Sequence, residues 1–172
     1  MEKNFRGCKL NIIRSLNAAR CNVIVVPYDT DPEEIAFLKP DGIVISNGPG
    51  NPEDAGVVIE TARALSGRYP MLGICLGHQI LALSHGAKTY KLKFGHRGGN
   101  HPVREESTGS IFMTAQNHSY AVEEGSLSGT DFSVAFRNLL DDTIEGLCLE
   151  KERIFTVQFH PESAPGPNDA RE

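Results

Sequence analysis

The sequence predicts an α/β fold in which a mostly parallel central sheet carries helices on both faces and ends in an antiparallel C-terminal part. Apolar residues make up 40% and charged residues 23% of the 172 residues, as is usual for a globular domain. Helical and strand patterns alternate in the first half, which is typical of parallel strands joined by helices. Strand patterns dominate the second half, and no helix of similar strength separates the last three, so antiparallel pairing is expected there.

The first half is predicted to contain four helices and three strands. Apolar residues at helical spacing indicate the helices, and Pro32 stands at the first position of the second one. Short apolar runs that end at proline or turn-forming residues indicate buried strands. The helices are expected at 9–19, 31–38, 53–65 and 79–83, and the strands at 22–26, 42–46 and 70–74. The third helix is expected to turn inward Val57, Val58, Ile59 and Ala62.

The second half is predicted to be mainly strand. Turns are expected at 141–142 and at 151–152, and an irregular tail at 165–169. The strands are expected at 111–115, 132–137, 144–149 and 154–159. A chain of this length is expected to form one domain, here residues 1–172.

The charge balance excludes several classes of partner. Seventeen basic and 22 acidic residues give a net charge of −5, and no basic cluster points to nucleic acid. No apolar run is long enough to cross a bilayer, and residues 1–10 are too polar for a signal peptide. We therefore expect a cytoplasmic protein without nucleic-acid or membrane partners.

No metal site is expected. The four cysteines have no zinc-type spacing, and without a secretory signal they are expected to be free thiols: Cys8, Cys21, Cys75 and Cys148. His96 and His101 have a loose metal-like spacing, but no carboxylate or thiol lies near them in the sequence. They are interpreted, like the remaining histidines outside the motifs below, as structural or solvated: His78, His85 and His118.

The strongest local signal is the run Gly73-Ile74-Cys75-Leu76-Gly77, where a predicted strand leads directly into a helix. This is the nucleophile-elbow pattern with sulfur in place of oxygen. Glycines on both sides are expected to leave room for a strained nucleophile. The helix N-terminus would favour the thiolate, and the N–H of Leu76 would face a developing oxyanion. Alone, the pattern is more often a turn beside a buried thiol.

A base for this thiol is expected from His160, in the run Gln158-Phe159-His160-Pro161-Glu162 after the last predicted strand. Glu162 could accept the other N–H of the imidazole and fix its tautomer. Cys75 and His160 are 85 residues apart (160 − 75), so only the fold can bring them together. The loops at the C-terminal ends of parallel strands share one crevice, which makes that meeting plausible.

A third motif, residues 47–52, is a cluster of glycine, proline and asparagine at the end of another predicted strand. Its glycines would let a backbone N–H approach a ligand, as a second wall of an oxyanion hole. It has no phosphate-loop pattern, and alone it would be a plain loop. Three such motifs at predicted strand ends make a catalytic site the favoured interpretation.

Together these motifs resemble class I (triad-type) glutamine amidotransferases. The resemblance is carried by residues 46–52, 73–79 and 160–162, and it is closest to the glutaminase domain of the carbamoyl-phosphate synthetase small subunit, through residues 93–103, 114–118 and 165–169. It implies a three-layer, flavodoxin-like fold over nearly the whole chain. Compared with that small subunit, the chain is expected to lack the N-terminal domain and to be truncated at both ends of the glutaminase domain.

The resemblance also implies residue roles. Cys75 would form a thioester with glutamine, His160 would move the protons, and Glu162 would orient His160. The oxyanion would be held by the backbones of Leu76 and Gly50, with Gly48 in the same loop. Further residues are implied to hold glutamine: Gln79, Asn117, Ser119 and Tyr120.

The implied partner is the large subunit of carbamoyl-phosphate synthetase, in a hetero-oligomer that serves arginine or pyrimidine biosynthesis. ATP, magnesium and bicarbonate are expected only on that subunit, and no cofactor is expected in this chain. Two other functions stay open at this stage. One is a non-catalytic regulatory or interaction module with the same fold, and the other is a stand-alone γ-glutamyl hydrolase.

Overall fold

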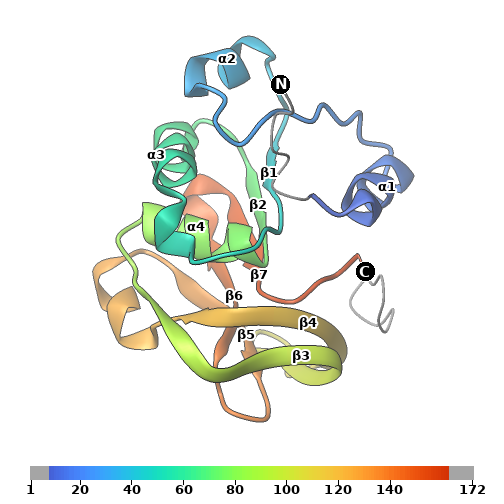
Figure 1. Ribbon diagram of the computed structural model, residues 1–172, viewed down its shortest axis with the longest axis vertical. Helices are drawn as coiled ribbons and strands as arrows, with labels where there is room; N and C mark the ends of the chain where they lie inside the picture. The colour runs from blue at the N-terminus through green and yellow to red at the C-terminus, as the bar shows by residue number, and fades with distance from the viewer. Residues whose placement is uncertain (1–7, 163–172) are drawn as a thin grey trace.

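The computed structural model describes residues 8–162, and the tail expected to be irregular at 165–169 lies outside them. The described residues form a mixed α/β fold around a seven-stranded sheet of order β1-β2-β7-β6-β5-β3-β4 (Figure 1). The strands are β1 (Ile43–Ile45), β2 (Met71–Ile74), β3 (Thr89–Glu105), β4 (Ile111–Val122), β5 (Ser133–Asn138), β6 (Ile144–Leu149) and β7 (Ile154–Val157). The α-helices are α1 (Leu10–Ala18), α2 (Pro32–Phe37), α3 (Gly56–Leu65) and α4 (Leu76–Ser84).

The parallel part of the sheet consists of β1, β2 and β7. All other neighbouring strands, from β7 through to β4, pair antiparallel. The predicted α/β class with an antiparallel C-terminal part is confirmed. The antiparallel part is larger than expected, because β3 and β4 join the sheet as a long hairpin (Figure 1, lower half).

Helices cover both faces of the parallel strands, as the sequence predicts. Successive strand residues point to opposite faces, so β1 and β2 supply side chains to two separate apolar clusters. Met71 packs with residues of α3 and α4, such as Leu65 and Leu81. Leu72 packs on the other face with Ile12 of α1. In Figure 1, α3 and α4 accordingly lie on one side of β1 and β2, and α1 lies on the other.

Two predicted helices form with different starting points. The expected helix at 53–65 is divided into a 3₁₀ turn, Pro52–Asp54, and α3, because Asn51 caps the turn and the chain leaves helical geometry at Ala55. Val57, expected to face inward, is exposed, whereas Ala62 is buried and Val58 and Ile59 pack against the core. Helix α4 begins three residues earlier than expected, immediately after Cys75.

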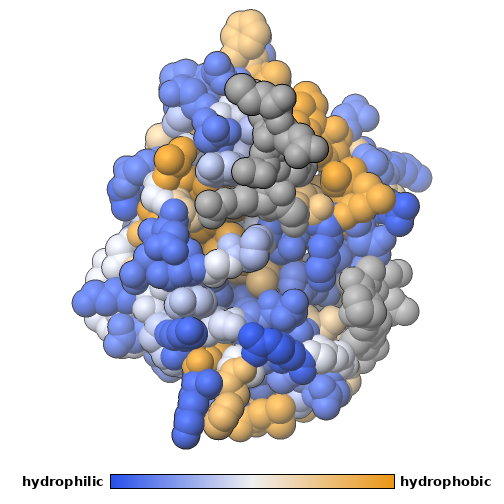
Figure 2. All heavy atoms as spheres, in the orientation of Figure 1, coloured by the Kyte–Doolittle hydropathy of each residue, from blue (hydrophilic) through white to orange (hydrophobic). Residues whose placement is uncertain are grey.

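The strand expected at 22–26 does not form. In the described part of the chain no neighbouring strand pairs with it, and an apolar run needs such a partner to satisfy its backbone groups. The side chain of Ile24 is 67% exposed. Figure 2 shows hydrophobic side chains gathered in this upper, N-terminal part of the visible face, while the lower part is mostly hydrophilic.

Strand β3 was not predicted. Gly95 and Gly98 have positive φ angles, and the pairing with β4 shifts register between Lys91 and His96 and again between Gly98 and His101. Glycine and bulges break the two-residue alternation by which a strand is recognised. The pairing with β4 therefore holds β3 in place where its own sequence has little strand propensity. None of the helices within residues 8–162 has the length and apolar character needed to cross a membrane.

Candidate active site

A cavity of about 490 Å³ lies where the parallel strands end. Because β2 pairs with β7 in parallel, with Ile74 opposite Val157, the residues that follow these two strands start out as neighbours. This places Cys75 and His160 on the wall of the same cavity. Segments from distant parts of the sequence complete the wall: Lys9, Asn47–Asn51, Leu76, Gln79, Lys91 and Asn117–Tyr120.

Cys75 occupies a strained turn between β2 and α4. Its φ is +55° and its ψ is −102°, a combination that costs a non-glycine residue roughly 1–3 kcal/mol. The N–H of Cys75 donates to the carbonyl of Val157 at 2.8 Å, which continues the pairing of β2 with β7 by one residue. The turn thus presents the thiol at the start of α4, as the elbow pattern predicts.

The glycines of the elbow leave room beside the strained Cys75, as expected, and the atoms that need this room belong to α4, β2 and β1. Neither Gly73 nor Gly77 is among the residues with positive φ. A Cβ on Gly73 would lie 2.7 Å from the backbone of Gly77, and a Cβ on Gly77 would lie 1.9 Å from the carbonyl oxygen of Ile45. The glycines therefore let α4 pack directly against β2 and β1, and the strain falls on Cys75 itself.

Burial holds the thiol of Cys75 neutral, which agrees with the expected need for a base and outweighs the expected effect of the helix N-terminus. Burial raises the pKa of Cys75 to about 12, and the hydrogen bond from Leu76 and the charge of Lys9 only partly oppose that effect. The helix N-terminus favours the charged thiolate, but Cys75 is only 4% exposed, and the loss of hydration on burial has the larger effect on its pKa. A nucleophile at this position needs a base beside it.

His160 is the base candidate in the cavity wall. Its Nδ1 lies 2.8 Å from Glu162 Oε1, and both side chains are buried. Its backbone N–H donates to the carbonyl of Ala115 in β4 at 2.9 Å. An Nδ1–H donated to Glu162 leaves the lone pair on Nε2, the tautomer that can take a proton from a thiol.

Lys9 and Asn11 were not predicted from the sequence, and they hold this arrangement from the face of the sheet that α1 covers. Lys9 Nζ lies 3.1 Å from the same Glu162 oxygen, and its backbone N–H donates to Asn47 Oδ1 at 3.1 Å. Asn11 Nδ2 donates to the backbone carbonyl of Glu162 at 2.9 Å. More than 150 residues separate Asn11 from Glu162, and no motif in the sequence connects these positions.

The carboxylate of Glu162 is stabilised in its charged form. Burial alone would raise the pKa of Glu162, but the hydrogen bond and charge of His160, together with the hydrogen bond from Lys9, lower it overall. A charged Glu162 favours the imidazolium that His160 becomes when it accepts a proton. The ion pair with Lys9 therefore belongs to the acid–base arrangement, although Lys9 is far away in the sequence.

The loop after β1, predicted as a second wall of an oxyanion hole, lines the same cavity. Gly50 has a φ of +105° and Asn51 caps the following 3₁₀ turn by accepting from the N–H of Glu53. Gly48 and Gly50 line the cavity together with Leu76. This loop and the start of α4 therefore face the same space as the thiol.

The residues expected to hold glutamine also line the cavity, on α4 and on β4. Gln79 Nε2 donates to the carbonyl of Tyr120 at 2.8 Å and to Gln158 Oε1 at 2.7 Å. Both of its donor hydrogens are thereby used, and its Oε1 stays available as an acceptor. The hydroxyl of Ser119 accepts from Arg97 at 2.7 Å, and Ser119 is not among the residues with positive φ.

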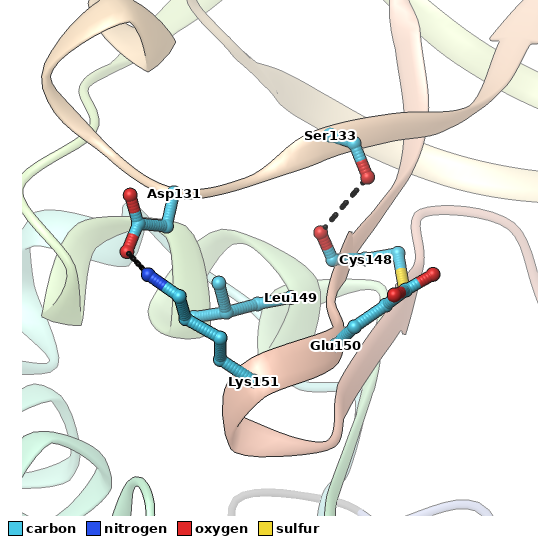
Figure 3. Close-up of a pocket in the computed structure, with 6 residues that line it drawn as sticks. All are labelled: Asp131, Ser133, Cys148, Leu149, Glu150 and Lys151. Carbon is cyan, nitrogen blue, oxygen red and sulfur yellow. Dashed lines mark hydrogen bonds and ion pairs between the residues drawn. The ribbon is translucent and has the colours of Figure 1, made fainter.

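A second cavity, of about 280 Å³, lies between the beginning of β5 and the end of β6 (Figure 3). Lys151 Nζ lies 3.3 Å from Asp131 Oδ2, and the hydroxyl of Ser133 donates to the carbonyl of Cys148 at 3.2 Å. Burial and the charge of Glu150 raise the pKa of the Cys148 thiol. No histidine lines this cavity, so it has no counterpart of the thiol–imidazole arrangement.

Comparisons with known proteins show a family likeness over nearly the whole chain. The family model of class I glutamine amidotransferases matches residues 3–171. The chain is 54% identical over 163 residues to the carbamoyl phosphate synthase small chain of Listeria innocua, and 56% identical over 164 residues to the carbamoyl phosphate synthase pyrimidine-specific small chain of Halalkalibacterium halodurans. Each alignment covers 95% of this chain and 45% of the relative, so the chain spans less than half the length of these relatives.

Solved structures with the same fold include a protein from Thermoplasma acidophilum described as part of a GMP synthase, with a TM-score of 0.73 and 26% identity. That alignment covers 88% of this chain and 77% of the other. A glutamine amidotransferase from Thermotoga maritima gives a TM-score of 0.63 at 18% identity, covering 89% of this chain and 69% of the other.

Proposed function

Because this chain belongs to the class I glutamine amidotransferase family, we propose that it hydrolyses the side-chain amide of glutamine to glutamate and ammonia. The proposal depends above all on one observation. Cys75 and His160 line one cavity although 85 residues separate them, and His160 Nδ1 lies 2.8 Å from Glu162 Oε1. A thiol, an imidazole and an orienting carboxylate are the groups that acyl transfer from an amide requires.

The proposed reaction begins with a proton transfer. His160 Nε2 takes the proton of the Cys75 thiol while the sulfur attacks the amide carbon of glutamine, and Glu162 stabilises the imidazolium. The backbone N–H groups of Leu76 and Gly50 hold the developing oxyanion, each contributing roughly 10²–10³ in rate. His160 then gives its proton to the leaving nitrogen, and ammonia departs from a γ-glutamyl thioester. Water activated by His160 hydrolyses the thioester and restores the thiol.

Substrate holding is assigned to the wall formed by α4 and β4. Gln79 offers an acceptor oxygen, because its two amide hydrogens are already donated to Tyr120 and Gln158. Such an acceptor suits a protonated α-amino group. Asn117, Ser119 and Tyr120 lie along the same wall.

We also propose that the ammonia serves carbamoyl phosphate synthesis on a separate large subunit. The support is the name of the relatives, which are carbamoyl phosphate synthase small chains at 54–56% identity. ATP, magnesium and bicarbonate would then act on that subunit, and this chain would need no cofactor for its own step. One of the relatives carries the pyrimidine-specific name, which points to pyrimidine rather than arginine synthesis as the first pathway to test.

The direct test is glutamate release from L-glutamine by the wild type and by Cys75→Ala, with Cys21→Ala as the matched control. Cys21 is an exposed free thiol outside the cavity, so its loss should leave the rate unchanged. We expect Cys75→Ala to fall to the background rate. Full activity in Cys75→Ala would remove the assigned nucleophile.

Two further measurements separate the alternative functions. Stoichiometric labelling of Cys75 by a diazo-ketone analogue of glutamine would count against a non-catalytic module. A preference for γ-glutamyl peptides over free glutamine would instead favour a stand-alone γ-glutamyl hydrolase. We expect labelling at Cys75 and a preference for free glutamine.

A further inference from the structure

A cluster of buried polar side chains lies behind the cavity wall, at the junction of β3, β4 and β6. His96 comes from β3, Gln116 and His118 come from β4, and Glu145 comes from β6. All four side chains are buried, and Glu145 is fully buried. The hydrolysis proposed above uses none of their side chains. No metal is expected here from the sequence, because no carboxylate is near His96 along the chain, but the sheet brings Glu145 next to it.

In both His96 and His118, one ring nitrogen faces an oxygen that can only accept a hydrogen bond, so that nitrogen must carry the hydrogen. His118 Nδ1 lies 2.8 Å from the carbonyl of Tyr120, so it carries a hydrogen and leaves the lone pair on Nε2. His96 Nε2 lies 2.7 Å from Asp141 Oδ2, so in the neutral ring the lone pair is on Nδ1. These two lone-pair nitrogens face each other at 3.2 Å.

The orientation of the Gln116 amide is fixed as well. The hydroxyl of Thr114 donates its single hydrogen to the carbonyl of His101 at 2.8 Å, so it can only accept from Gln116. Gln116 Nε2 is that donor, at 3.2 Å. Its Oε1 must therefore face the two imidazoles, 3.1 Å from His96 Nδ1 and 2.8 Å from His118 Nε2.

Glu145 adds a carboxylate to these acceptors. Its Oε1 lies 3.4 Å from His96 Nδ1 and accepts from Asn138 Nδ2 at 3.0 Å. Its Oε2 has no hydrogen-bond partner. A buried carboxylate with one unpartnered oxygen is costly unless a positive group lies beside it.

With both imidazoles neutral, four acceptor atoms converge with no donor between them, and this geometry points to a cation site. We propose that His96 Nδ1, His118 Nε2 and Glu145, with the weaker oxygen of Gln116, bind a divalent transition-metal ion of the zinc type. Two imidazoles and one glutamate are an established zinc ligand set. Tetrahedral zinc with bonds near 2.0–2.1 Å separates its ligands by about 3.3 Å. His96 Nδ1 lies 3.2 Å from His118 Nε2 and 3.4 Å from Glu145 Oε1, and the ligand atoms of these three residues all lie within 4.8 Å of one another.

The surrounding hydrogen bonds have the pattern typical of a metal centre. Asp141 holds the outer nitrogen of His96, and the carbonyl of Tyr120 holds the outer nitrogen of His118. Such outer partners orient ligand imidazoles and raise their basicity. The ion would be structural, joining β3, β4 and β6 behind His118, which itself lines the cavity. It would thereby stabilise the part of β4 that lines the cavity with Asn117, Ser119 and Tyr120.

A proton is the competing occupant. Hydrogen bonding to Glu145 and to Asp141 raises the pKa of His96 to about 9, so an imidazolium could also separate the facing acceptors. A proton and a metal ion cannot both occupy Nδ1 of His96. The two occupants are therefore distinguished by metal stoichiometry.

The experiment adds Co²⁺ to the chelator-treated full chain and records its visible spectrum, with elemental analysis after addition of Zn²⁺. We expect one equivalent of metal and the intense visible bands of tetrahedral cobalt, without a thiolate charge-transfer band. Glu145→Gln, which keeps the shape of the side chain, should lose these bands. Asp141→Asn should weaken Co²⁺ binding roughly 10–100-fold through the orientation of His96.

Two control variants exclude other metal sites. His85→Asn removes an imidazole that pairs with Glu152 outside the cluster, and Cys75→Ala removes the buried thiol, so both should keep the cobalt spectrum. Circular dichroism verifies that Glu145→Gln is folded. If it is not, the stoichiometry and spectrum of the wild type still decide the matter.

Failure of the wild type to take up one equivalent would overturn the proposal and leave the proton as occupant. The same holds if the cobalt spectrum persists in a folded Glu145→Gln protein. Because the readout is metal content and not glutamine hydrolysis, this result is independent of the proposed reaction.

Discussion

At Cys75, burial and backbone geometry determine the protonation state of the thiol before any substrate arrives. The side chain stands in a strained turn, and its pKa is raised to about 12. A free thiolate would lose most of its hydration in this position, whereas a thiol that passes its proton to His160 during attack avoids a bare buried charge. The resting protein is therefore expected to protect its nucleophile from general electrophiles.

Because the thiol of Cys75 is buried and neutral, we expect slow alkylation of Cys75 in the resting protein. At pH 8, iodoacetamide should label Cys75 roughly 100-fold or more slowly than the exposed Cys21, because only the thiolate reacts. The rate at Cys75 should keep rising with pH up to about 12. Mass spectrometry of digested protein measures both sites in one sample. Equal rates at pH 8 would contradict a neutral buried thiol.

Glu162→Gln tests the orienting carboxylate. We expect kcat for glutamine to fall roughly 10²–10⁴-fold with a smaller change in KM, because the imidazolium of His160 loses its charged partner. The side-chain amide introduced at this position can still accept from His160, so the fold should persist. Glu34→Gln, an exposed carboxylate in the first turn of α2, is the control and should leave kcat unchanged.

The same variant has a pH-dependent stability signature. The pKa of Glu162 is lower in the folded protein than its ordinary 4.5, so its stabilising contribution is present above pH 4.5 and is lost as pH falls through the native value. The difference in Tm between wild type and Glu162→Gln should therefore be largest near neutral pH and shrink below pH 4.5. Thermal unfolding monitored by circular dichroism at several pH values measures it. A difference that grows toward acid would contradict the assigned sign.

At the scale of elements, the packing of α4 against β1 and β2 decides where the elbow points. Gly77 sits where the helix touches the carbonyl of Ile45, and a Cβ there would lie at 1.9 Å. Such a contact cannot be relieved by a side-chain rotation, because the obstructing atom belongs to the backbone. The helix would have to move, and with it the N–H groups that face the cavity.

Gly77→Ala should accordingly lower the free energy of unfolding by at least the 1–3 kcal/mol typical of overpacking. Gly56→Ala is the matched control at the beginning of α3, where a Cβ meets nothing within 4 Å. There the expected change is a stabilisation of about 0.5–1 kcal/mol, from the lower flexibility of alanine in the unfolded chain. Urea unfolding measures both. A neutral Gly77→Ala would show that α4 is less tightly packed than described.

The elements that sequence reasoning predicted correctly are those with a clear period of their own. The helix at 9–19, the strand at 70–74 and the strand at 144–149 have apolar spacing that requires no knowledge of neighbours, and each has its counterpart in α1, β2 and β6. The wrong predictions concern segments whose structure depends on whether another strand pairs with them. The run 22–26 looks like a strand but has no partner among the described residues, whereas β3 is rich in glycine and forms because β4 pairs with it.

The candidate site likewise contains residues that a local sequence pattern indicated and residues that only the fold brings there. The sequence pointed to Cys75 and His160 because each stands in a recognisable local pattern after a strand. Lys9 has no such pattern, and its ion pair with Glu162 exists only because α1 covers the face of β1 and β2 next to β7. Contacts between residues that are neither in a motif nor near one in sequence become visible only when the sheet order is known.

On the scale of the whole molecule, the cavity links segments from almost the full length of the described chain. Its wall runs from Lys9 through the loop after β1, the elbow and β4 to His160. No single element holds the site, so a ligand that fills the cavity favours the folded state as a whole. Ligand binding should therefore be measurable as global stabilisation, without any turnover.

Cys75→Ser provides this measurement, because it keeps the size of the side chain and removes the nucleophile. L-Glutamine at 100 times its Kd should stabilise the folded variant by about 2.7 kcal/mol, which for a domain of this size raises Tm by about 5–10 °C. D-Glutamine and L-asparagine are the matched controls, because each keeps the amide but places it differently relative to the α-amino group. They should give much smaller shifts at the same concentration if Gln79 and the β4 wall hold glutamine at both ends. Equal shifts for all three ligands would mean that the cavity does not select glutamine, and the absence of any shift would contradict its assignment as the substrate site.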